Sequence, residues 1–99
     1  MSAPDGTAKV EVLRVDGVRE EHHVGKHILM PWILRMIGAQ AADVVNLRDG
    51  RVMVVDDTGM IDNKPANPQA TALYHGVCRP GTVHPICGDV AIANDEDFA

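Results

Sequence analysis

The chain has 99 residues, which is enough for one hydrophobic core and too few for two. Its net charge of −5, from 14 acidic and 9 basic side chains, argues against a general binder of phosphate backbones. Hydrophobic residues make up 45% of the sequence but aromatic residues only 3%, so we expect an aliphatic core without platforms for stacking bases.

The sequence favours a single cytoplasmic domain. No apolar run reaches the roughly 18 residues of a membrane-spanning helix, and the first residues lack the pattern of a secretion signal. Two cysteines are too few for a disulfide framework, so we expect a reduced protein in the cytoplasm of a host cell. We interpret residues 1–7 as a disordered lead, residues 8–93 as one domain and residues 94–99 as an acidic tail.

Polar and apolar residues alternate at the start of the chain and predict a hairpin. Residues 8–15 form the first expected strand. Asp16 and Gly17 follow, a dipeptide typical of hairpin turns, and residues 18–24 return. The second run is charged, which is typical of a strand at the edge of a sheet.

Residues 25–38 predict the longer helix, because their apolar side chains recur at i, i+3 and i+4. A proline is tolerated only in the first turn of a helix, so we expect this helix to begin near Met30 or Pro31. Gly38 is expected to end it, since glycine readily adopts the left-handed conformation that follows a helix.

A second hairpin is expected from residues 42–47 and 51–55, which flank a turn that contains glycine. Residues 56–59 predict a tight turn in which Gly59 takes a positive φ. These predictions leave residues 60–66 as a loop.

Asn67 is expected to cap a short helix that runs from Pro68 to residue 74. Residues 88–93 predict a last strand. Because the strands are expected to pair through hairpins, the sequence predicts an α+β fold. It would hold a small, antiparallel, hairpin-rich sheet with one longer and one short helix.

Two histidines and two cysteines form the sharpest candidate metal site. They occur in two pairs, each with a two-residue gap, and thiolate and imidazole are the ligands that tetrahedral zinc prefers. The five residues between the pairs are fewer than in common zinc fingers, and each pair mixes one His with one Cys. The alternative is two small cysteines in the core and two loop histidines. The four residues are His75, Cys78, His84 and Cys87.

The loops at 56–66 and 76–87 are expected to wall a pocket, with Asn67, Arg79 and His84 as its binding residues. No phosphate-binding loop, dinucleotide fingerprint or nucleophile elbow occurs in the sequence, so we assign no catalytic residue and expect a protein without enzymatic activity.

Three motifs follow one another in the second half of the chain: Asp56-Asp57-x-Gly59 after a strand, then Asn67-x-x-Ala70-Thr71, then Gly88-Asp89-Val90. In this order they resemble a family of short proteins of unknown function from bacteriophages and plasmids. That family has an acidic D-E-x-G turn, a helix that opens at the Asn and a final G-D-hydrophobic strand. The chain departs from the family pattern in having Asp at position 57 and Pro31 within the helix.

The resemblance covers roughly residues 9–98 and implies a mobile genetic element as the source, without an assigned activity. The small size, the acidic charge and the missing catalytic signatures favour a small accessory protein of such an element that binds a host protein, in one version to counter host defence. Two alternatives are a small-molecule or nucleotide binder and a zinc-stabilised nucleic-acid-binding module, the latter disfavoured by the negative charge. A homo-oligomer is compatible with each alternative, and a membrane partner is not expected.

Overall fold

The computed structural model describes residues 6–59, 62–78, 81 and 83–98. It contains a five-stranded antiparallel sheet and two α-helices, which confirms the expected α+β class. Within these residues no helix is both long enough and apolar enough to cross a membrane.

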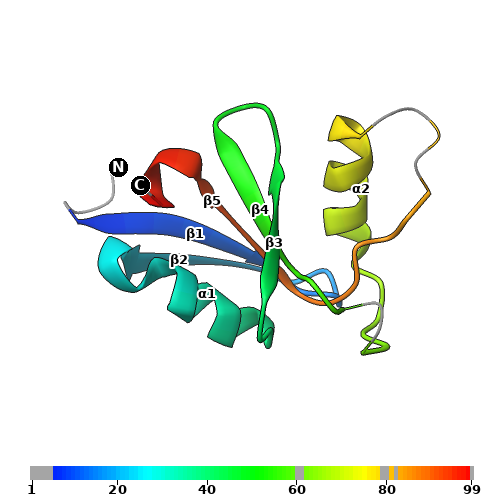
Figure 1. Ribbon diagram of the computed structural model, residues 1–99, viewed down its shortest axis with the longest axis horizontal. Helices are drawn as coiled ribbons and strands as arrows, with labels where there is room; N and C mark the ends of the chain where they lie inside the picture. Colours follow the sequence, from blue (N-terminus) through cyan, green and yellow to red (C-terminus); the bar gives the residue numbers. More distant parts are fainter. Residues whose placement is uncertain (1–5, 60–61, 79–80, 82, 99) are drawn as a thin grey trace.

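Two hairpins supply the outer strands of the sheet. The first joins β1 (Thr7–Leu13) to β2 (Arg19–Gly25), and the second joins β3 (Ala42–Asn46) to β4 (Arg51–Asp56). β5 (Val90–Asn94) lies between the hairpins and pairs with β1 and β4, so the strand order is β2-β1-β5-β4-β3. The last strand of the chain is therefore the centre of the sheet (Figure 1).

The first helix has the limits that its proline and glycine impose. A 3₁₀ turn at Lys26–Ile28 leads into α1 (Leu29–Ile37), so the helix begins one residue before the expected start and keeps Pro31 in its first turn. Gly38 ends it with φ of +68°, and its N–H donates to carbonyl oxygens in the last turn. The predicted C-terminal glycine is confirmed.

The two helices cover opposite faces of the sheet (Figure 1). Because side chains alternate along a strand, β1 directs Val12 toward α1 and Leu13 toward α2 (Pro68–Val77). The core on the α1 face is formed by Ala8, Val10, Val12, Val24, Leu29, Ile33, Ile37, Val54, Ala91 and Ala93. The core on the α2 face is formed by Leu13, Leu47, Met53, Val55, Ala70, Val90 and Ile92.

α2 covers only the part of its face that lies away from β2. Toward β2 the same face carries charged side chains that pair across the strands, with Lys9 Nζ 2.8 Å from Glu21 and Arg19 3.0 Å from Glu11. β2 is thus a charged outer strand, as the sequence predicts.

Gly59 is needed for a different reason from the predicted one. Gly59 does not take a positive φ. In the loop that follows, Asn63 has a positive φ of +57°. A Cβ at Gly59 would lie 2.7 Å from the carbonyl oxygen of Cys87, so the close approach of that strand-like segment requires glycine. The single sequence contains no signal for this contact.

α2 and β5 also differ from the predicted ranges. α2 continues to Val77 and includes Gly76, because Val77 packs against the core of the α2 face. β5 begins at Val90, two residues later than expected. Glycine often ends a helix, and at Gly76 tertiary packing overrides that local preference.

Both ends of the described chain are held against the sheet. β1 begins at Thr7, and the carbonyl of Gly6 accepts a hydrogen bond of 2.9 Å from the N–H of Lys26. Residues 1–5 of the expected lead at 1–7 lie outside the described residues. The acidic segment Asp95–Phe98 forms a 3₁₀ turn in which Asp97 is buried and Phe98 packs against the core of the α1 face.

Candidate functional site

Asn67 caps α2 as predicted, but it also joins three segments. Its side-chain oxygen accepts from the N–H of Ala70 at 3.1 Å. Its amide nitrogen donates to the carbonyls of Leu13 at 2.9 Å and Gly88 at 3.0 Å, inside the protein. The residue is fully buried, and both amide hydrogens are used, so the side chain has no N–H left for a ligand.

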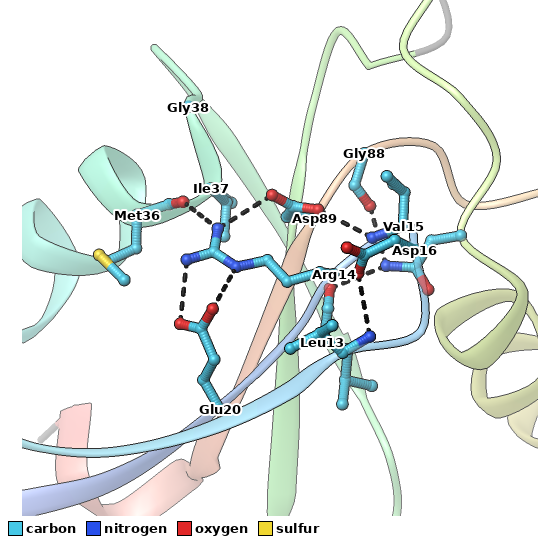
Figure 2. A network of polar contacts seen from close by, with 12 residues as sticks. Leu13, Arg14, Val15, Asp16, Glu20, Met36, Ile37, Gly38, Gly88 and Asp89 are labelled. Atoms are coloured by element: carbon cyan, nitrogen blue, oxygen red, sulfur yellow. Dashed lines mark hydrogen bonds and ion pairs between the residues drawn. The ribbon is translucent and has the colours of Figure 1, made fainter.

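Arg14 is the centre of a polar network, hereafter the Arg14 network, shown in Figure 2. Its guanidinium donates two hydrogen bonds of 3.0 Å to Glu20, and one of 2.9 Å each to Asp89 and the carbonyl of Met36. Asp89 also accepts from the N–H of Val15 at 2.9 Å. The network therefore ties the first hairpin to the end of α1 and to the segment before β5.

Two carboxylates of this network share the single guanidinium of Arg14. Hydrogen bonds from Arg14 and then from His22 lower the pKa of Glu20 to about 2. A carboxylate that accepts a bidentate pair of guanidinium hydrogen bonds is held strongly in its ionised form. We assign this network a structural role.

Asp56 and Lys64 form a second satisfied pair beneath the end of α1. Lys64 Nζ contacts the Asp56 carboxylate and donates to the carbonyl of Gly38 at 2.9 Å. Burial opposes ionisation of Asp56, but hydrogen bonds from Lys64 and Thr58 outweigh it and lower the pKa of that carboxyl. These groups hold the loop after β4 against α1.

A shallow hollow of about 210 Å³ lies between the β3–β4 hairpin and α2. It takes residues from both loops that the sequence analysis expected to wall a pocket, and His84 is among them. Asn67 is not, and Arg79 lies outside the described residues. The hollow is lined by Asp43, Val55, Asp56, Asp57, Tyr74, His84, Pro85, Ile86 and Cys87.

Two carboxylates of the hollow stand beside one another without a cation. A side-chain hydrogen bond with Asp43, and then repulsion between the two charges, raise the pKa of Asp57. Both side chains belong to exposed residues, and among the described residues no lysine or arginine forms an ion pair with either of them. Among the described residues, these two carboxylates thus have no lysine or arginine partner.

The size of the hollow limits its occupant. Pockets for drug-sized ligands usually measure about 300–1,000 Å³, whereas this one has about 210 Å³. The adjacent carboxylates of Asp43 and Asp57 would also repel a phosphate. Both properties disfavour a nucleotide and leave room for one side chain.

The structure does not bring the His/Cys quartet together. Cys78 is the residue that ends α2, whereas Cys87 pairs with Ala66 just before α2 begins. Ten residues of helix separate the two ends by about 15 Å, far more than two thiolates on one zinc ion allow. His75 instead contacts the backbone carbonyl of His84 at 2.8 Å. The described part of the chain contains no cluster of three or more metal-ligating side chains.

The alternation of hydrogen-bonded pairs in the second hairpin shows which backbone groups of β3 face away from the sheet. The N–H of Leu47 donates to Arg51 at 3.0 Å, and the N–H of Asp57 donates to Ala41 at 3.2 Å. In an antiparallel ladder such pairs alternate with pairs that do not exchange hydrogen bonds. The odd-numbered residues from 41 to 47 therefore bond to β4.

Ala42, Val44 and Asn46 consequently direct their N–H and C=O groups away from the sheet. β3 is the last strand in the order, and no described strand pairs with its outer side. Val44 is 54% exposed, so the edge is open and carries an apolar side chain at its middle. We call this row of three residues the β3 edge.

Sequence reasoning missed the β3 edge and the role of Asp43. Which hairpin strand lies at an edge depends on β5, which inserts between the two hairpins from the far end of the chain. The sequence predicted a strand at residues 42–47, but it gave no information on the neighbours of that strand. Asp56 ends β4 and Asp57 follows it, and the proximity of these two aspartates to Asp43 follows only from the strand register.

Comparisons of the chain with protein-family models, with curated proteins and with solved structures find no match. The resemblance to phage and plasmid proteins therefore rests on the motifs given above. Function is inferred here from the surface features of the molecule.

Proposed function

We propose that this protein acts without catalysis, by binding an extended segment of another protein at the β3 edge. The observation that carries the proposal is the row of outward backbone groups at Ala42, Val44 and Asn46. An extended segment that pairs with such a row adds a strand to the sheet, and its main-chain hydrogen bonds supply affinity.

The two outer strands differ in how they discourage such pairing. The residues of β2 whose backbone N–H and C=O groups face away from the sheet are Arg19, Glu21 and His23. Charged side chains commonly protect the edge of a sheet from pairing. β3 has Val44 in the middle of its outward row. The difference supports β3, rather than β2, as the docking strand.

The resemblance to phage and plasmid proteins supports a host protein as the partner, bound in the host cytoplasm. Interference with a host defence system is one version of this role. The small acidic hollow supports neither a nucleotide nor a nucleic acid as the primary ligand.

Affinity capture with matched baits tests the proposal. Val44→Pro removes the central outward N–H, and because that N–H does not bond to β4, the internal ladder is preserved. Val44→Thr keeps the N–H and is the control. We expect wild type and Val44→Thr to retain the same stoichiometric partner from a lysate of the bacterial host and Val44→Pro to lose it. A partner retained equally by all three baits, or no stoichiometric partner for wild type, would contradict the proposal.

A further inference from the structure

We propose that the segment bound at the β3 edge carries a lysine or arginine opposite Asp43, and that its cationic group enters the hollow beside Asp57. This inference rests on the proposed function and specifies the chemistry of its partner. It makes the β3 edge the source of affinity and the hollow the source of selectivity.

Register places the partner's side chain at the hollow. Ala42 and Val44 would each exchange main-chain hydrogen bonds with the segment, so the residue opposite Asp43 falls between them in a non-hydrogen-bonded pair. Side chains are closest at such pairs, with Cβ atoms about 4.5–5.5 Å apart. Asp43 pairs with Val55, whose side chain belongs to the core on the α2 face, so the partner's residue would point to that face and toward the hollow.

Charge selects a cation at this position. Asp43 and Asp57 line the same hollow, and among the described residues no ion pair relieves the repulsion between their carboxylates. The single positive charge of a lysine or arginine would be attracted by both carboxylates, whereas a glutamate would add a third negative charge. Tyr74 lines the same hollow and offers an aromatic ring to the cation. The volume of about 210 Å³ fits one long side chain.

The opposite face of the sheet defines the neighbouring positions. Val44 pairs with Val54, which belongs to the core on the α1 face, and Val44 itself is 54% exposed. Partner residues opposite Ala42 and Val44 would lie on this face and extend its apolar surface. The structure therefore specifies an apolar–basic–apolar triplet as the recognised pattern.

Synthetic peptides test the pattern directly. The probes are fluorescent peptides of sequence Thr-Ser-Val-X-Val-Ser-Thr in which X is Arg, Gln or Glu, titrated with the full chain at low salt and followed by anisotropy. We expect wild type to bind the Arg peptide at least about threefold more tightly than the Gln peptide, and the Glu peptide most weakly. Moderate salt should reduce the difference in affinity between the three peptides, because it screens the interactions of exposed charges.

Two variants and one control variant distinguish a failure of this inference from a failure of the proposed function. Asp43→Asn/Asp57→Asn should bind the three peptides with equal affinity, whereas Val44→Pro should bind none of them and Val44→Thr should behave as wild type. Circular dichroism checks that each variant is folded. If wild type binds all three peptides alike and Val44→Pro binds none, the result supports docking at the β3 edge. The proposed selectivity for a basic side chain is then wrong. A preference for Arg that survives in the double variant also overturns it. If wild type binds no peptide, or Val44→Pro binds as wild type does, both proposals fail.

Discussion

One pair of carboxylates lies in the Arg14 network and another pair, Asp43 and Asp57, lies in the hollow, and the surroundings of the two pairs differ. Glu20 and Asp89 share the guanidinium of Arg14, whereas Asp43 and Asp57 share no cation among the described residues. The first arrangement lowers the pKa of Glu20, and the second raises the pKa of Asp57. Charge that is satisfied within the chain holds the fold, and charge that is left uncompensated at an open edge is available to a partner.

The comparison predicts that stability depends on the satisfied groups, and Asn67 should show the largest effect. Asn67→Ala removes the cap of α2, worth about 1 kcal/mol. It also removes the amide that donates to the carbonyls of Leu13 and Gly88 inside the protein, and a buried acceptor left unsatisfied costs about 1–3 kcal/mol. We expect the free energy of unfolding in urea to fall by about 3 kcal/mol or more. A loss of only about 1 kcal/mol would reduce Asn67 to a simple cap.

The Arg14 network should give the next largest effect. Arg14→Gln leaves Glu20, Asp89 and the carbonyl of Met36 without their common donor, so we expect a loss of about 2 kcal/mol in unfolding free energy. Arg19→Gln is the matched control, because the side chain of Arg19 is 61% exposed, against 23% for Arg14. Its loss should stay within about 0.5 kcal/mol. Equal losses in both variants would contradict the structural role of the network.

The two clusters should also respond to pH with opposite sign. The pKa of Glu20 is lowered from 4.5 to about 2 on folding, so its contribution is present above pH 4.5 and is lost as the pH falls toward 2. Glu20→Gln should remove part of this acid-induced loss in urea midpoints measured from pH 2 to 6. Folding raises the pKa of Asp57, so its ionisation destabilises the native state as the pH rises above 3.8. A Glu20→Gln profile parallel to wild type would refute the first half of the prediction.

The smallest effect on stability is expected at the hollow. Asp43→Asn/Asp57→Asn removes a repulsive pair at exposed residues, so we expect the unfolding free energy to change by less than about 0.5 kcal/mol, toward higher stability. Differential scanning calorimetry at neutral pH measures the change. A loss above about 1 kcal/mol would mean that these carboxylates support the fold.

Local signals in the sequence were sufficient for the elements of the fold. Gly38 ends α1, Asn67 and Pro68 begin α2, alternation predicted the first hairpin, and strand-like runs around a glycine-containing turn predicted the second. The order of the strands could not be predicted, because β5 joins the two hairpins through contacts between distant parts of the chain. Gly59 illustrates the same limit, since its reason lies in the carbonyl of Cys87 rather than in its own turn.

The candidate site was harder to predict than the fold. The spacing of His75, Cys78, His84 and Cys87 suggested zinc, but α2 places the two cysteines at opposite ends of a helix. His84 does line a hollow between the expected loops, whereas Asn67 is used inside the protein. Asp43 could not be predicted as a binding residue, because it is a lone acidic residue in a strand. Its place beside Asp57 and at the β3 edge depends on the strand register.

Residue-resolved amide hydrogen exchange tests the central claim most directly. In the free protein, the account predicts fast exchange at Ala42, Val44 and Asn46 and slower exchange at Asp43 and Val45, whose N–H groups face β4. Saturation with the Arg peptide should slow exchange at the three outward amides and leave those of β2 unchanged. Outward amides that are already protected in the free monomer, or protection by the peptide that appears on β2, would contradict the claim that β3 is the docking strand.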